Sequence, residues 1–198
     1  MGIFADQLKN SAADMEGMAT WLDSLDHDTR VKEVRSLGPA AQKRLWVLTE
    51  SSRMSVSDMV PDDTPVLRPV RHYGRNTLPV FKLFEKRFCR APEGAEPAGL
   101  WGYNEGSTRG LVGPGYFVCR PTTGAETDIS DVVIDYTILP TDKPESWPAI
   151  QSNEKGVSRF VYAGMQDFMR KVSTHVTIGR AYRHGKISNN YFMLCREG

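Results

Sequence analysis

Hydrophobic positions near the start of the chain recur at helical spacing. Apolar residues follow one another at three- and four-residue intervals over Phe4–Leu22, which predicts an amphipathic helix. Asp26 or Asp28 can cap a second, short helix, and a Gly-Pro step ends it before a third helix begins at Pro39. The apolar stripes of these helices are thin for an independent bundle. We therefore expect residues 1–52 to form a helical segment that packs on the main domain.

The next two segments give weaker patterns. Prolines interrupt residues 53–79, and no periodicity is sustained there, so we interpret this segment as an irregular connection to a main domain of residues 80–198. Val80–Arg90 is ambiguous, because its phenylalanines fit one face of a helix while its aromatic content suits a strand. Its charged residues fall largely on the other side of a helical wheel, which favours the helix.

Two-residue alternation of apolar positions dominates the rest of the chain and predicts strands. A pattern that turns at His184-Gly185 predicts a terminal hairpin. An apolar stripe at helical spacing, which begins at Val157, predicts a helix over about residues 157–171. The predicted strands cover residues 100–104, 115–121, 132–139, 175–183 and 187–196.

Together these elements predict an α+β fold. We expect an N-terminal helical layer, followed by a curved antiparallel sheet of about five strands that the late helix grips. Sheets of this kind commonly enclose a cavity between the helix and the concave face. The fold therefore favours, without specifying, a ligand-binding protein.

Composition narrows the class of protein. The three cysteines are an odd number at wide spacing, which is typical of reduced thiols in a cytoplasmic protein. No apolar run approaches the ~20 residues that span a bilayer, and Met1–Asp6 lacks the features of a signal peptide. The four histidines show no metal-ligand spacing, so the sequence predicts neither a metal site nor a cofactor.

Charge is distributed unevenly although the formal net charge is +1. Residues 1–63 carry eleven acidic and seven basic side chains, whereas residues 64–90 carry seven basic side chains against one acidic residue, Glu85. The basic segment can attract an anion, or it can pair with the acidic helices of its own chain. Nucleic acid is not expected as a partner, because the pI is about 7.7 and no recognition module is present.

Aromatic side chains gather on the predicted strands. Tyr and Trp combine an apolar body with a polar tip, as pockets for amphiphilic ligands often require. Our leading hypothesis is a non-catalytic cytoplasmic module that binds a small amphiphilic or anionic ligand. The predicted site comprises aromatic residues around the apolar part of the ligand and arginines at its anionic end, namely Trp101, Tyr103, Tyr116, Tyr182, Arg71, Arg75, Arg109 and Arg180.

Two alternatives come from other classes of protein. Exposed Met18 and Trp21 on the first helix would favour a protein-interaction module that docks on an acidic partner or on a second copy of the chain. An enzyme is the second alternative, with Cys119 as nucleophile beside His175 and Asp135 if the sheet brings them together. Buried cysteine and hydrogen-bonded aspartate explain the same residues with fewer assumptions.

Overall fold

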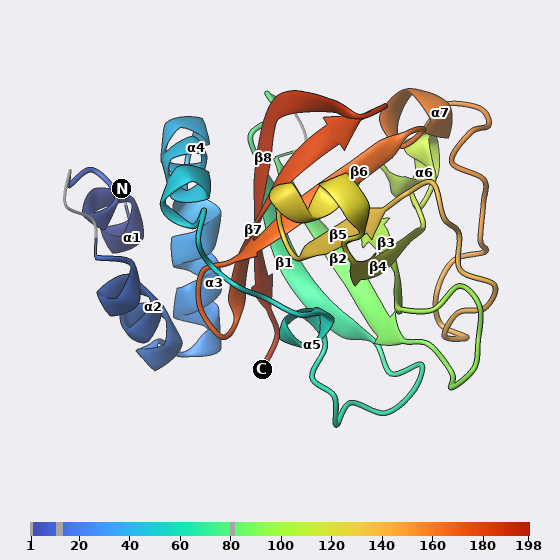
Figure 1. Cartoon of the computed structure of the whole chain (residues 1–198), viewed down its shortest axis with the longest axis horizontal. Helices are drawn as coiled ribbons and strands as arrows, with labels where there is room; N and C mark the ends of the chain where they lie inside the picture. Colours follow the sequence, from blue (N-terminus) through green and yellow to red (C-terminus); the bar gives the residue numbers. More distant parts are fainter. Residues whose placement is uncertain (1, 11–13, 80–81) are drawn as a thin grey trace.

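A closed antiparallel barrel forms the body of the protein (Figure 1). The computed structural model describes residues 2–10, 14–79 and 82–198. Within this part of the chain, each of eight strands pairs with the next, and the last strand pairs back with the first. Closure leaves no unpaired strand edge. The strands are β1 (Val70–Asn76), β2 (Leu83–Arg90), β3 (Leu100–Glu105), β4 (Phe117–Pro121), β5 (Val132–Asp135), β6 (Met165–Lys171), β7 (Val176–Arg183) and β8 (Lys186–Arg196).

Helices precede the barrel, and short helices also lie in three of its connections. Four helices at the N-terminal end form a layer beside the barrel, where α3 contacts β1 and β8, and α4 contacts β7 and β8 (Figure 1). The helices are α1 (Ile3–Gln7), α2 (Met15–Ser24), α3 (His27–Ser36), α4 (Pro39–Leu48), α5 (Val56–Met59), α6 (Arg109–Val112) and α7 (Ser158–Val161), with one 3₁₀ helix, η1 (Gly124–Asp128).

Local sequence signals explain how the N-terminal helices begin. The Asp26 carboxylate accepts a hydrogen bond of 3.0 Å from the Thr29 amide and caps α3, and Pro39 occupies the first turn of α4. The stretch predicted as one helix from Phe4 contains both α1 and α2, and the Asp14 carboxylate caps the second of these. Residues 11–13, within that prediction, lie outside the described residues.

The helical layer buries the outer face of the barrel. Val34 and Leu45 pack in one cluster with Ile178 and Met193, and all four side chains have no exposed surface. Because β7 and β8 also face the barrel interior, both of their faces are covered. The N-terminal helices and the barrel thus share one hydrophobic cluster.

The predicted open sheet of about five strands, gripped by a late helix, is wrong. The five predicted strands are present, and the terminal hairpin is confirmed by the pairing of β7 with β8. Three further strands, β1, β2 and β6, complete the circle. These three strands lie where the sequence pattern predicted an irregular connection or a helix.

β6 occupies the second half of the stretch predicted as a helix over residues 157–171. The predicted helix is reduced to the short α7, and Gly164 adopts a φ of +65°, which ends it before the strand begins. Met169 faces the barrel core while Phe168 faces the helical layer. A strand buried on both faces loses its two-residue alternation, and here its apolar residues imitate a helical stripe.

β1 and β2 were missed for different reasons. β1 starts directly after Pro69, inside the segment predicted to be irregular. In β2, Phe84 and Phe88 share the inner face, and a spacing of four residues satisfies a strand as well as a helix. Residues 80 and 81, which the helix prediction included, lie outside the described residues.

Glycines on the inner face of the barrel make room for aromatic rings. A Cβ atom at Gly179 would lie 2.1 Å from the nearest atom of the Phe192 ring. Each such glycine is paired directly with a phenylalanine on the neighbouring strand, an arrangement that covers the exposed backbone of a strand glycine. The pairs are Gly74 with Phe84, Gly102 with Phe117, and Gly179 with Phe192.

Candidate functional site

The barrel interior is filled at one end and hollow at the other. Near α5 it is packed with apolar side chains such as Phe88, Phe117 and Leu194. At the opposite end, beside α6 and α7, a cavity of about 540 Å³ opens to the surface. This volume is within the range of small-molecule sites. The connections β1–β2, β3–β4, β5–β6 and β7–β8 all lie at the open end, because the strands alternate in direction.

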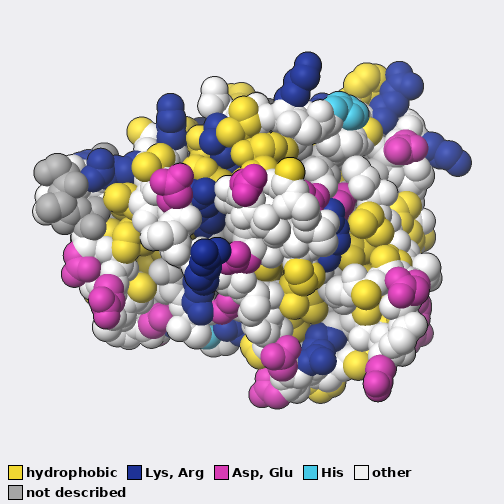
Figure 2. Space-filling model, viewed as in Figure 1, with side chains coloured by type: hydrophobic (Ala, Val, Ile, Leu, Met, Phe, Trp, Pro, Cys, Tyr) yellow, Lys and Arg dark blue, Asp and Glu magenta, His cyan; other side chains and the backbone are white. Residues whose placement is uncertain are grey.

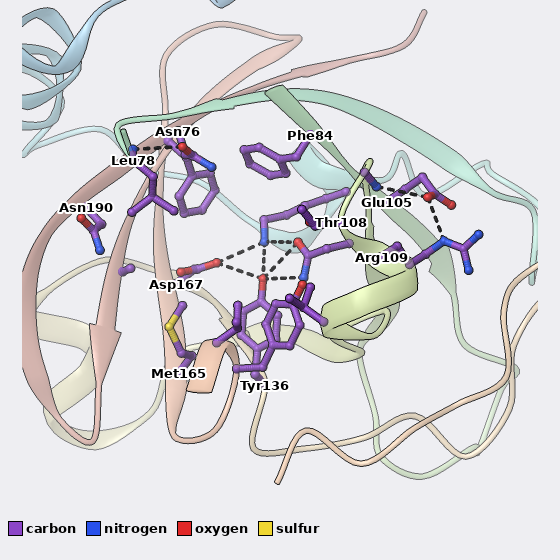
Figure 3. A pocket seen from close by; sticks show the side chains of 18 of the residues that line it. Asn76, Leu78, Phe84, Glu105, Thr108, Arg109, Tyr136, Met165, Asp167 and Asn190 are labelled. Carbon is purple, nitrogen blue, oxygen red and sulfur yellow. Dashed lines mark hydrogen bonds and ion pairs between the residues drawn. The ribbon is translucent and has the colours of Figure 1, made fainter. Parts of the chain in front are cut away.

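A buried polar cluster forms the floor of the cavity. We call Lys86, Asn104, Tyr136 and Asp167 the floor cluster; they come from β2, β3, the end of β5 and β6. The Lys86 ammonium donates to Asn104 Oδ1 at 2.9 Å, to Asp167 Oδ2 at 3.1 Å and to the Tyr136 hydroxyl. Figure 3 shows the side chains of Tyr136 and Asp167 meeting in this cluster, with its hydrogen bonds drawn as dashed lines. All three protons of the ammonium group are therefore engaged within the protein.

One acceptor of the floor cluster has no protein partner. Asp167 is 3% exposed, and its Oδ2 accepts hydrogen bonds from Lys86 and from the Tyr136 hydroxyl at 3.2 Å. Its Oδ1 is buried and makes no hydrogen bond. Figure 3 shows one oxygen of the Asp167 carboxylate joined to the cluster by dashed lines and the other turned away from them. A buried acceptor without a partner is costly, and a ligand that donates a hydrogen bond would satisfy it.

Burial changes the acidity of the cluster. It lowers the pKa of Lys86, and the Asp167 carboxylate opposes this effect. Burial also raises the pKa of Tyr136 well above its ordinary value, and the nearby Asp167 adds to the increase. Tyr136 thus keeps its proton, and the charged part of the cluster is the Lys86–Asp167 ion pair.

The walls above the floor are largely apolar. Phe84 and Phe192 meet edge to face with ring centroids 6.0 Å apart, and Tyr162 stacks on Tyr136 at 5.5 Å. Met165 adds a flexible thioether to the lining. A guest in this cavity would contact aromatic and aliphatic surface over most of its length and polar groups at its deep end.

Two residues of the predicted site border this cavity. Arg109 lies in α6 at the cavity edge, where its Nε is 2.8 Å from Glu105 Oε1. Tyr182 packs on the outer face of the barrel against Phe168, with ring centroids 4.7 Å apart, and contributes to the cavity edge. The other six predicted residues lie elsewhere.

Three predicted aromatic residues do come together, but outside the barrel. Trp101, Tyr103 and Tyr116 form a buried cluster with Trp147, in which Tyr103 and Trp147 have ring centroids 4.9 Å apart. Trp147 belongs to the long β5–β6 connection, which covers the outer face of β3 and β4. The cluster is part of the core, and it does not line the cavity.

The remaining predicted arginines lie on the outer face of the barrel. Arg71 donates to the Tyr73 hydroxyl at 3.1 Å, and Arg75 donates to a backbone carbonyl of α3. Arg180 Nε donates to the Ser188 carbonyl at 2.8 Å beside a shallow hollow lined by Trp46. Within the basic segment of residues 64–90, ion pairs form inside the chain, namely Arg71 and Arg87 with Glu85, Arg90 with Asp62, and Lys86 with Asp167.

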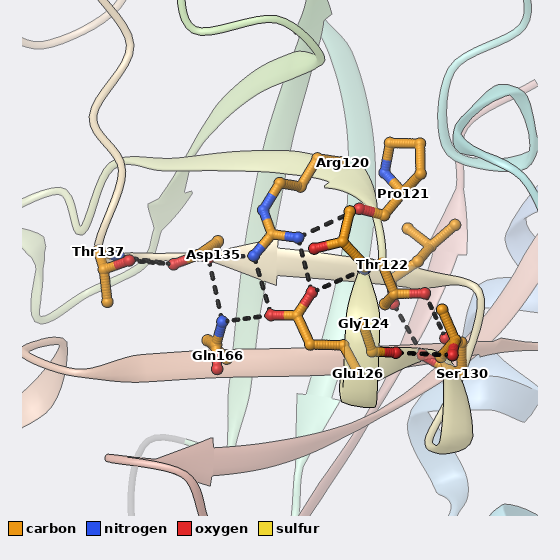
Figure 4. A network of polar contacts seen from close by, with 12 residues as sticks. Arg120, Pro121, Thr122, Gly124, Glu126, Ser130, Asp135, Thr137 and Gln166 are labelled. Atoms are coloured by element: carbon orange, nitrogen blue, oxygen red, sulfur yellow. Dashed lines mark hydrogen bonds and ion pairs between the residues drawn. The ribbon is translucent and has the colours of Figure 1, made fainter.

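The structure does not bring the proposed nucleophile, base and carboxylate together. Cys119 pairs with Ile134 and faces the barrel interior, whereas Asp135, the next residue along β5, faces outward. Asp135 Oδ2 lies 2.7 Å from Arg120 Nη2, within a network that includes Glu126 (Figure 4). His175 lies in the β6–β7 turn, at the end of the barrel opposite the cavity.

The helical layer does not present the apolar surface on which the interaction hypothesis depended. Met18 is buried, and Trp21 is partly buried with its ring 6.2 Å from that of Phe4. Within the described residues, no group of three or more His, Cys, Asp and Glu side chains could hold a metal ion. The same residues contain no helix with the length and apolar character needed to cross a bilayer.

Sequence analysis missed all four members of the floor cluster. Lys86 stands between Phe84 and Phe88 at two-residue spacing, so a strand assignment for this segment would have placed a charge on an apolar inner face. Asp167 was missed because it lies within the stretch of residues 157–171 that was predicted to be a helix. Comparison of the chain with family models, curated proteins and solved structures gives no match. The site must therefore be interpreted from its own geometry.

Proposed function

We propose that this protein is a cytoplasmic module that binds a small amphiphile in the barrel cavity. The observation that carries the proposal is the combination of apolar walls with a buried floor on which Asp167 Oδ1 lacks a partner. A guest would enter with its polar end first, because the polar groups lie deepest. The three buried, unpaired thiols support a reducing compartment.

The floor cluster favours a neutral head group that donates a hydrogen bond. Lys86 has no proton left to offer, and its charge is balanced by Asp167. A carboxylate at the floor would approach Asp167 without gaining a free donor. Of the two ligand types suggested by the sequence, amphiphilic or anionic, we therefore favour the uncharged amphiphile, such as an alcohol or an aromatic amine.

A fluorescent probe can test this proposal. N-phenyl-1-naphthylamine is uncharged, carries one N–H donor and brightens in apolar surroundings. We expect saturable binding to the wild-type protein, displacement by decanol, and weaker displacement by decanoate. Each added methylene of the competing alcohol should raise its affinity about fourfold, as expected for about 0.8 kcal/mol per buried CH₂, until the cavity is full.

Two matched variants locate the binding. Val112→Trp places a large ring at the cavity edge, whereas Val66→Trp adds the same ring at an exposed position before β1. We expect Val112→Trp to abolish probe binding and Val66→Trp to leave it unchanged, with both variants giving wild-type circular dichroism spectra. Absence of saturable binding to the wild type, or equal binding by both variants, would reject the proposal.

A further inference from the structure

Exposed hydrophobic side chains concentrate around the mouth of the cavity. Among the described residues, ten large hydrophobic side chains are exposed, and seven of them lie at the open end of the barrel, either on a connection or at the strand end beside it. Leu111 and Phe160 are the most exposed, at 71% and 64%. The seven are Leu78, Leu83, Leu111, Val157, Phe160, Val161 and Ile187.

The barrel topology explains why these residues meet. Successive antiparallel strands bring every second connection to the same end, so four segments far apart in the sequence surround one opening. We define the mouth rim as residues 77–79, 82–83, 105–113, 154–162 and 183–187. Each of the four connections, together with the strand ends beside it, contributes at least one exposed hydrophobic side chain to it. A concentration of this kind marks an interaction surface.

The mouth rim is also basic. It contains six Lys and Arg residues and two Glu residues, although the whole chain has a net charge of only +1. Arg109 pairs with Glu105, but no ion pair among the described residues includes Lys155, Arg159 or Lys186. Figure 2 shows Lys and Arg side chains projecting from the molecule's upper edge beside hydrophobic side chains, near the position of α7 in Figure 1.

We propose that the mouth rim docks on a lipid bilayer that contains anionic headgroups. Single hydrophobic side chains on separate loops would enter the bilayer interface, while the basic side chains between them would contact the headgroups. The guanidinium of Arg159 lies 4.6 Å from the centroid of the Phe160 ring, which combines both properties at one point. This docking does not depend on whether the cavity holds a ligand.

Charge argues against a second copy of the chain as the occupant. A symmetric dimer through this surface would place the basic rim of one copy against the same basic rim of the other. Such like-charge contacts are unfavourable, and an anionic surface removes the conflict. A bilayer also accommodates hydrophobic residues on four loops without a matching protein shape.

Vesicle flotation of the full chain tests the proposal. Vesicles of phosphatidylcholine with about 30% phosphatidylserine should carry the wild-type protein upward, and pure phosphatidylcholine should carry much less. The double variant Leu111→Ser/Phe160→Ser should reduce binding to anionic vesicles at least tenfold. The matched control Val47→Ser/Val66→Ser changes two exposed hydrophobic residues distant from the mouth and should bind as the wild type does.

A second pair of variants tests the charge. Arg159→Gln/Lys186→Gln should weaken binding to anionic vesicles about 30-fold, because each cation near such a surface contributes about fivefold. Lys43→Gln/Arg68→Gln, at exposed positions elsewhere, should not change it. The proposal would be overturned by absent binding to anionic vesicles, by equal losses in rim and control variants, or by a stable dimer in light scattering that Leu111→Ser/Phe160→Ser dissociates.

Discussion

Lys86 on β2 and Asp167 on β6 form an ion pair inside the barrel, with 3.1 Å between Nζ and Oδ2. Their side chains are 3% and 4% exposed, so neither charge is solvated by bulk water. The two strands are not neighbours in the sheet, and the pair therefore ties distant parts of the barrel together across its interior. It also separates the packed half of the interior from the hollow half.

Breaking this pair should destabilise the protein strongly. Lys86→Met leaves the Asp167 charge buried without compensation, and we expect a loss of about 3–5 kcal/mol in the free energy of unfolding. Lys171→Met provides a control, because Lys171 forms a comparably short but partly exposed pair with Asp58 that should contribute about 1 kcal/mol or less. Urea denaturation measures both losses. Equal losses would show that burial of the Lys86 pair has no special cost.

Replacing both partners separates the cost of an unpaired charge from the value of the pair. In Lys86→Met/Asp167→Leu no buried charge remains, and we expect the double variant to recover much of the stability lost in Lys86→Met. A double variant as unstable as the single one would indicate that the pair itself stabilises the barrel. Urea denaturation again provides the comparison.

The contact between Gly179 and Phe192 predicts a position where a single methyl group is not tolerated. Gly179→Ala would place its Cβ against the Phe192 ring, and we expect a loss of about 1–3 kcal/mol from overpacking. Gly110→Ala, where no atom lies within 4 Å of the new Cβ, should be neutral or slightly stabilising. Gly179→Ala/Phe192→Leu should recover part of the loss in thermal denaturation if the ring is the cause.

The strands that sequence analysis identified are those with one clear pattern. Val132, Ile134 and Tyr136 alternate with residues of the opposite face, and the structure places all three on the inner side of the barrel, on β5 and directly after it. β6 lacks such a pattern, because Met165, Phe168 and Val172 recur at three- and four-residue intervals, as they would on one face of a helix. Its apolar positions then reflect two different environments, neither of which is visible before the tertiary structure is known.

The site was harder to predict than the strands. Aromatic residues on strands did form clusters, but Trp101 and Tyr116 belong to a cluster outside the barrel, since alternation alone does not tell which face encloses the cavity. Lys86 and Asp167 meet only because the barrel closes. Without β1, β2 and β6 the sheet does not close around an interior. Nothing in the sequence pattern then indicates that Lys86 and Asp167, which are 81 residues apart, form a pair.

His72 should make stability depend on pH. The ring is buried, its Nε2 donates to the Met59 carbonyl at 2.9 Å, and burial lowers its pKa from 6.5 to about 3. Between these two values the unfolded chain binds a proton that the folded protein does not, so stability rises with pH in this window and falls on acidification. From pH 7 to pH 5 we expect His72 to account for a loss of about 2 kcal/mol.

The variant His72→Gln isolates this contribution. Glutamine can donate to the Met59 carbonyl but does not titrate, so the variant should lose about 2 kcal/mol less than the wild type between pH 7 and pH 5. Urea denaturation at the two pH values gives the comparison, and the carboxylates common to both proteins cancel. Identical pH dependence in the two proteins would contradict the assignment.

The three cysteines should be inert in the folded protein. Burial raises the pKa of Cys89 and Cys119 to about 12 and that of Cys195 to about 11, and none of the three side chains is exposed. At pH 8 a thiol with a pKa near 12 is ionised to roughly one part in ten thousand, and the thiolate is the reactive form.

We expect dithionitrobenzoate to label no cysteine rapidly in the native protein and all three in urea. Val47→Cys, at an exposed site on α4, should add one rapidly labelled thiol and serves as the control. Rapid labelling requires a thiolate, which the packed interior of the barrel does not favour. Rapid labelling of Cys119 without unfolding would therefore contradict this prediction and would favour Cys119 as a nucleophile.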